Sequence, residues 1–269
     1  VNDYYKLQTE AERIYKLIPP AYKDAFFELV LYPVKACANL NALYVTAAKN
    51  HLFASQGRSE TNLLADSVKK LFERDSLLSH EYNSLGGGKW NHMMDQTHIG
   101  YTYWQQPPVQ TIPSTKRIPV PEKASMGISV DGSASAWPED KKNARVPAIS
   151  KVNTSTYIDL FNRGSLPYEY SIQSDAPWLV ISSSKGSIRH SKRIQLRADW
   201  TKAPVGKSEA HLSIKGPEDQ IATVTVPLEN FIPQKFRGFA ETNGYVSIQA
   251  DHCSKAVQEG AVHWEMIPG

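Results

Sequence analysis

The sequence predicts a multidomain chain in which an all-α helical bundle is followed by an antiparallel, immunoglobulin-like β-sandwich. Apolar residues recur every three or four positions through about the first hundred residues, which is typical of amphipathic helices. After residue 150, polar and apolar residues alternate in several short runs, which is typical of strands with one buried face. Five prolines between residues 107 and 121 separate the two patterns.

Three helices are predicted in the first region. The first runs from Tyr5 to Ile18 and is closed by Pro19 and Pro20. The second is long and contains Pro33, so we expect a kink near residues 29–33. The third opens after Ser59, and glycines at 57 and 86–88 mark the turns around it. The apolar stripes that should pack as an antiparallel bundle are Phe26, Leu29, Val30, Val34, Cys37, Leu40, Leu43, Tyr44 and Ala47 on the second helix, and Leu63, Leu64, Val68, Leu71, Phe72, Leu77 and Leu78 on the third.

Six short strands are predicted in the second region, with turn residues between them. They cover residues 157–161, 168–172, 178–181, 193–198, 211–215 and 223–226. A further strand is predicted at 244–250. The expected organisation is a bundle over 1–106, a proline-rich connector and extended segment over 107–150, a sandwich over 151–231, and the incomplete start of a C-terminal domain over 232–269.

Composition excludes several classes of function. The net charge of +3 is small and evenly spread, which argues against nucleic acid as a partner. No run approaches the ~20 apolar residues of a membrane span, so a soluble protein without a membrane partner is expected. The two cysteines, Cys37 and Cys253, lie far apart and are expected to be unpaired, with Cys37 in a helix core.

The segment 86–104 is the most unusual stretch, with four glycines, two histidines and two tryptophans but little charge. Its His92, Asp95 and His98 have metal-ligand chemistry, but six-residue spacing turns the outer pair away from one helix face. Polar groups at a domain interface are therefore expected, without a metal or cofactor. No nucleophile elbow, phosphate loop or pair of carboxylates in an aromatic setting is present, so no catalytic residue is predicted.

Several motifs resemble those of glycoside hydrolase family 115, in that family's order. The most specific is the segment from Gly87 to Trp104. The others are Leu31-Tyr32-Pro33-Val34, Ala38-Asn39-Leu40-Asn41, Gln56-Gly57-Arg58, residues 158–164, Pro177-Trp178-Leu179, Asp199-Trp200 and residues 244–250.

This resemblance implies an inverting xylan α-1,2-glucuronidase, which removes glucuronic acid or its 4-O-methyl ether from xylan branches. The catalytic groups of that family are carried by a preceding (β/α)₈ barrel of about 250 residues, to which nothing here corresponds. The chain would then be a C-terminal scaffold without catalytic activity of its own. The implied partners are that barrel, a glucuronoxylan-type polysaccharide and a second copy in a homodimer, and the implied location is secreted or periplasmic. For substrate-proximal or supporting roles the candidates are His92, Gln96, His98 and Tyr101.

Two other hypotheses remain open. A stand-alone carbohydrate-binding or adhesion module would need a row of exposed aromatics on one sheet face. The alternation instead turns polar residues such as Arg193 and Lys215 outward, and Trp178 lies in an apolar run typical of a core position. An independent lyase or hydrolase built on the bundle would need a paired acid and base, for which the sequence gives no signature.

Overall fold

The computed structural model describes residues 1–269 except 139, 141, 232–237, 242–243, 253–254 and 266–269. The chain forms two compact units. The first comprises Val1–Lys123 with Arg163–Ser165, and the second comprises Ala124–Asn162 with Leu166–Gly269. The helical region followed by β-sheets agrees with the predicted order of a bundle and a sandwich.

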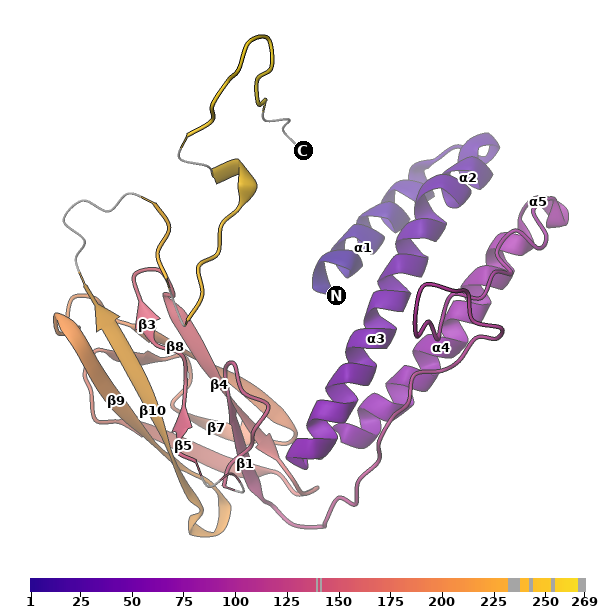
Figure 1. Ribbon diagram of the computed structural model, residues 1–269. Coiled ribbons are helices and arrows are strands. Elements are labelled where there is room, and N and C mark those ends of the chain that lie inside the picture. Colours follow the sequence, from indigo (N-terminus) through magenta and orange to yellow (C-terminus); the bar gives the residue numbers. More distant parts are fainter. Residues whose placement is uncertain (139, 141, 232–237, 242–243, 253–254, 266–269) are drawn as a thin grey trace. The chain divides into compact units, whose positions relative to one another are not determined.

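The first unit is helical, and α3 and α4 lie side by side along it (Figure 1). The long third helix is accompanied by α1, which contacts α3 and the π-helix that precedes it. The bounds of the helices are α1 Asn2–Leu17, α2 Pro20–Phe26, π-helix η1 Phe27–Leu31, α3 Tyr32–Gln56, α4 Thr61–Asn83 and α5 Leu85–Gly88.

The predicted irregularity at Pro33 takes the form of the π-helical turn η1. Proline has no N–H to donate within a helix, and a π-turn is one way in which a helix accommodates such a break. Tyr32 donates its N–H to the carbonyl of Phe27, five residues earlier. The turn also buries Phe27 and Leu31 together, so the break contributes to the core.

Two small apolar clusters stabilise the helical unit. One gathers around Phe27 and Tyr82, and the other around Leu43, Val68 and Ile99. The predicted stripes were too wide. Several of their members, on η1, α3 and α4, are exposed to solvent in the structure. They are Leu29, Val30, Cys37, Tyr44, Leu63 and Leu77. The prediction that Cys37 lies in a helix core was therefore wrong, and Cys253 lies outside the described residues.

Glycines follow both long helices, as predicted. Gly57 closes α3 in the left-handed conformation at φ 68°, where its N–H bonds back to the carbonyl of Ala54. Gly86, Gly87 and Gly88 also have positive φ, so the chain turns sharply after α4. A side chain would be strained at these positions.

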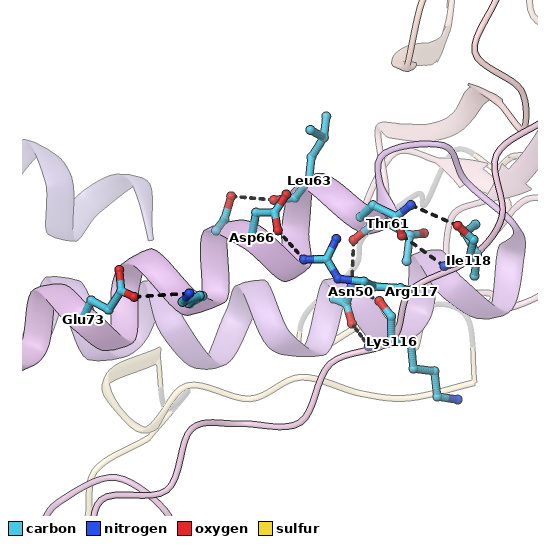
Figure 2. A network of polar contacts seen from close by, with 11 residues as sticks. Asn50, Thr61, Leu63, Asp66, Glu73, Lys116, Arg117 and Ile118 are labelled. Atoms are coloured by element: carbon cyan, nitrogen blue, oxygen red, sulfur yellow. Dashed lines mark hydrogen bonds and ion pairs between the residues drawn. The ribbon is translucent and has the colours of Figure 1, made fainter.

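After the helices, residues 107–121 run in an extended conformation without helix or strand, as the prolines predicted. Two asparagines on the helices hold this segment by its main chain. Asn50 bonds to Lys116 (Figure 2), and Asn62 bonds to Ile118. The side chains of Arg117 and Asp66 add an ion pair. We call residues 114–118 the strap.

The second unit is a sandwich of two sheets around one core. One sheet has the order β1-β4-β8-β6 and is antiparallel. The other has the order β2-β10-β9-β5-β7, in which β10 also pairs with β3, and its β2 and β3 run parallel to β10. The strands are β1 Met126–Val130, β2 Ala144–Arg145, β3 Ile149–Ser150, β4 Ser155–Asn162, β5 Tyr168–Ser174, β6 Leu179–Ile181, β7 Lys185–Ile188, β8 Ser191–Ala198, β9 Gly206–Lys215 and β10 Ile221–Asn230.

Alternation along the strands sets the two faces, as predicted. In β8, Ile194 and Leu196 are fully buried, whereas Arg193 and Arg197 face solvent. Trp178 is buried in the core, which confirms its predicted place. The sandwich was expected to start at residue 151, but β1, β2 and β3 lie before that point, within the segment expected to be an extended connector.

Beyond β10, the expected strand at 244–250 does not form. Residues 246–249 have no strand conformation, and a short 3₁₀-helix, η3, covers Ala250–His252. Val246 and Ile248, two apolar residues of the expected strand, are exposed. Across the described residues, no helix combines the length and the apolar character that spanning a membrane requires.

Candidate functional site

The best-supported candidate site lies on the helical unit, where His98 meets α4. Its Nε2 lies 3.0 Å from Oδ1 and 2.9 Å from Oδ2 of Asp75, a carboxylate that is 5% exposed. The hydrogen bond that Asp75 accepts from the ring raises the pKa of His98. Partial burial of the ring opposes this rise, and the Gln96 carbonyl adds to it. Asp75 therefore favours the protonated imidazole.

Both ring nitrogens of His98 already have partners. Nδ1 lies 2.9 Å from the carbonyl oxygen of Gln96 and 3.0 Å from Nε2 of Gln110. A general base or a metal ligand needs a ring nitrogen whose lone pair is available to the reacting group. His98 therefore ties its own segment to α4, and neither of its ring nitrogens is left open for direct chemistry.

Gln110 is the residue that the sequence did not reveal. Its Oε1 accepts hydrogen bonds from the N–H groups of His98, at 3.1 Å, and of Ile99, at 2.7 Å. Ile99 is fully buried between α3 and α4, and its carbonyl accepts the N–H of Thr111. These bonds join the two ends of the segment between residues 98 and 111 and anchor them on the helices.

His92 lies apart from His98 and does not join the same site. Its backbone has φ 70°, its side chain is exposed, and its Nδ1 lies 2.6 Å from Oδ2 of Asp95. The pair with His92 and a second bond from Asn83 lower the pKa of Asp95. Asp95 therefore stays ionised at neutral pH and is not suited to be a general acid.

The other two candidates lie at the surface of the same segment. The Gln96 side chain is exposed, and its Nε2 is 3.5 Å from Oε1 of Gln106. Tyr101 is also exposed and lies beyond the buried Ile99. The structure thus brings Gln96 and His98 together and leaves His92 and Tyr101 separate from them.

Two hollows flank Asp75 and Met94. A hollow of about 250 Å³ has mostly apolar walls, including Tyr32 and Met93, with His98 and Gln96 at its polar side. A more open one of about 500 Å³ is polar and holds Asp75 and Asp95 on its walls with Ser79 and Asn83. Both carboxylates are already paired with a histidine. In the residues that the structure describes, no three metal-ligating side chains come together.

Comparison with known proteins adds one family. Residues 238–269 match the profile described as the Glycosyl hydrolase family 115 C-terminal domain. The matched segment is short, and it coincides with the region in which residues 244–250 resemble that family. The match supports the resemblance at the level of a glycoside hydrolase family. No curated protein sequence matches the chain.

Solved structures resemble parts of the chain only weakly. The YadV chaperone is 15% identical over 36% of this chain and 52% of its own, with a TM-score of 0.27. The Escherichia coli chaperone DraB is 12% identical over 43% and 58%, with a TM-score of 0.28. A Bacteroides ovatus GH5 xyloglucanase is 11% identical over 38% and 19%, with a TM-score of 0.25. The chain spans only about half the length of the two chaperones, and none of these likenesses bears on function.

Proposed function

We propose that this chain is the C-terminal scaffold portion of a family 115 glycoside hydrolase. The enzyme would remove glucuronic acid, or its 4-O-methyl ether, from α-1,2 branches of xylan with inversion. The observation that carries the proposal is the match of residues 238–269 to the family's C-terminal domain. Upstream motifs in the family's order, from Leu31 to Trp200, support it.

In this proposal the chemistry is supplied by a (β/α)₈ barrel that precedes the helical unit. An inverting glycosidase needs one protonated and one ionised carboxyl group on opposite sides of the bond. The two carboxylates that line one hollow here are unsuited to such a pair. Asp75 is held by His98, and the pKa of Asp95 is lowered by His92. This supports a scaffold and argues against an independent hydrolase on the bundle.

The geometry around His98 supports a positioning role for the helical unit. His98, Gln110 and Asp75 fix a surface segment on α4, and such pinned loops are what a scaffold offers to a neighbouring domain or substrate. The sandwich, which we infer to be immunoglobulin-like in size, would serve domain packing and assembly into a homodimer. A secreted or periplasmic location belongs to the same proposal.

The sandwich itself gives no support to the alternative of a stand-alone carbohydrate-binding module. Such a module would present aromatic rings along one sheet face. Trp178 is buried, Tyr170 is buried, and the Tyr157 ring is covered by the Arg193 guanidinium at 3.6 Å. On the described strands the outward positions are dominated by polar and charged side chains.

The test uses the polypeptide that carries this sequence at its native length. Its intact mass is measured first, and release of uronic acid from 4-O-methylglucuronoxylan is then assayed. We expect a polypeptide longer by at least a barrel that releases uronic acid, and no release by residues 1–269 alone. A native-length protein that is inactive on every uronic-acid-branched glycan would overturn the proposal.

A further inference from the structure

The segment Gly100–Gln106, which we call the aromatic loop, has a base that is fixed by hydrogen bonds. At one end, the N–H of Gly100 donates to the hydroxyl of Tyr44 on α3 at 3.2 Å. At the other end, Nε2 of Gln106 donates to Oγ1 of Thr97 at 2.9 Å, and that hydroxyl donates to the carbonyl of Pro107. Together with Gln110, these bonds hold the loop against the helices before any ligand arrives.

The tip of the aromatic loop is open to solvent and aromatic. Trp104 is 85% exposed, Tyr103 is 61% exposed and Tyr101 is also exposed. An exposed tryptophan of this degree is uncommon, because such a ring is usually buried when it has no partner. Tyr103 donates its hydroxyl hydrogen to Oε1 of Gln105 at 2.8 Å, so a ring and an amide are fixed beside each other.

The aromatic loop and the sequence on either side of it lack acidic residues, lysine and arginine. From Gln96 to Thr115 the sequence contains no aspartate, glutamate, lysine or arginine. Each residue from Tyr101 to Gln106 carries a ring or a hydrogen-bonding group, and none is aliphatic. The aromatic loop thus combines a rigid base with a tip of tyrosine, tryptophan and glutamine. Such a tip is suited to an uncharged ligand.

We propose that the aromatic loop is a contact site for the main chain of a neutral polysaccharide. The Trp104 and Tyr103 rings would pack on the C–H faces of successive pyranose units, since an aromatic face attracts polarised hydrogens. The amides of Gln105 and Gln106 would hydrogen-bond the hydroxyl groups around the ring edge. This inference deepens the proposed function and rests on it for the identity of the polysaccharide, an unbranched stretch of xylan.

The chemistry of the loop favours a glycan over other ligands. Nucleic acid and anionic lipid surfaces are bound through lysine and arginine, of which residues 96–115 have none. Tyrosine and tryptophan give large contact areas at a small cost in side-chain entropy.

The experiment measures binding of xylohexaose and of a soluble unbranched xylan to the full chain, by titration calorimetry and by mobility in a xylan-containing gel. We compare wild type with Trp104→Ala, Trp104→Phe and, as the matched control, Val109→Ala, an exposed aliphatic residue near the same loop. Circular dichroism checks that each variant is folded. Trp104→Ala is expected to weaken binding roughly tenfold, Trp104→Phe less, and Val109→Ala not at all.

Binding that depends on Trp104 supports the inference. If cellohexaose or mannohexaose binds in place of xylohexaose with the same dependence, the glycan site stands and the proposed xylan substrate falls. If the chain binds none of these glycans, or if Trp104→Ala binds as wild type does, the inference is overturned. It is also overturned if Trp104→Ala changes only self-association in sedimentation, because the loop would then be a protein contact.

Discussion

Asn50 and Asn62 lie on neighbouring helices and hold the same extended segment, at residues two positions apart. Asn50 Oδ1 accepts the N–H of Lys116 at 2.6 Å, and its Nδ2 donates to the Lys116 carbonyl at 2.9 Å. Asn62 makes the equivalent pair of bonds to Ile118, at 3.0 Å each. Both asparagines therefore bind the main chain of the strap and not its side chains.

Replacing Asn50 by alanine should destabilise the helical unit more than replacing Asn62. Asn50 is fully buried and also donates to the carbonyl of Thr61 at 2.8 Å, so its loss leaves buried groups without partners. We expect a loss of about 2–3 kcal/mol for Asn50→Ala and about 1 kcal/mol for the half-buried Asn62. Urea unfolding followed by circular dichroism at 222 nm measures both. Equal stabilities of Asn50→Ala and wild type would show that the hydrogen bonds of Asn50 to the strap do not stabilise the unit.

The strap should tolerate changes of side chain but not loss of its N–H groups. Ile118→Pro removes the N–H that Asn62 accepts, whereas Ile118→Ala keeps it. Amide hydrogen exchange over residues 110–118 is expected to speed up in Ile118→Pro and to change little in Ile118→Ala. The natural prolines at 113, 119 and 121 avoid the clamped positions 116 and 118. Similar exchange in the two variants would show that the side chain, not the main chain, is held.

The helical unit should lose stability as the pH rises above about 6.5, the ordinary pKa of histidine. Asp75 raises the folded-state pKa of His98, so the protonated ring stabilises the native state. That contribution is complete below the unfolded pKa and is lost as the pH rises through the raised folded value. Unfolding of wild type and Asp75→Asn is compared between about pH 6 and pH 8.5. We expect the slope in wild type only, and parallel curves would refute the linkage.

The periodicity of apolar residues predicted the helices and most of the strands. The spacing of Leu43, Ala47 and Val68 indicated the paired helices, and Gly57 indicated where one of them ends. In the sandwich, alternation around Ile194 and Leu212 indicated both the strands and their buried faces. Such signals lie within a few residues of one another, which is why a sequence carries them.

Contacts between distant residues were not predictable in the same way. His98 meets Asp75 across 23 positions, and Asn50 meets Lys116 across 66. The sequence around either residue of such a pair does not indicate which distant residue it contacts. Apolar residues also mislead where a helix face has no partner, as Leu29 shows by its 77% exposure. The strand β1 was missed although Met126, Ile128 and Val130 alternate with Gly127 and Ser129, because glycine is uncommon inside strands and the run is short.

Gly127 in β1 is expected to be irreplaceable, because the Phe161 ring occupies the space of its missing side chain. A Cβ at 127 would lie 2.2 Å from Cε2 and 2.5 Å from Cζ of Phe161, on the neighbouring strand β4. Gly127→Ala should destabilise the sandwich by about 1–3 kcal/mol, as overpacking of a core does. Tryptophan fluorescence, to which the buried Trp137 and Trp178 of the sandwich core contribute, reports this unfolding, while the helical signal at 222 nm serves as the internal control.

A double variant separates this steric cause from a general loss of strand stability. Phe161→Leu replaces the ring that a Cβ at position 127 would meet with a smaller side chain. Gly127→Ala should therefore lower the free energy of unfolding less in the Phe161→Leu background than in wild type. Directly contacting residues commonly couple by about 0.5–3 kcal/mol. A coupling energy near zero would mean that Phe161 does not set the requirement for glycine, and that the strand, not the contact, is sensitive to the change.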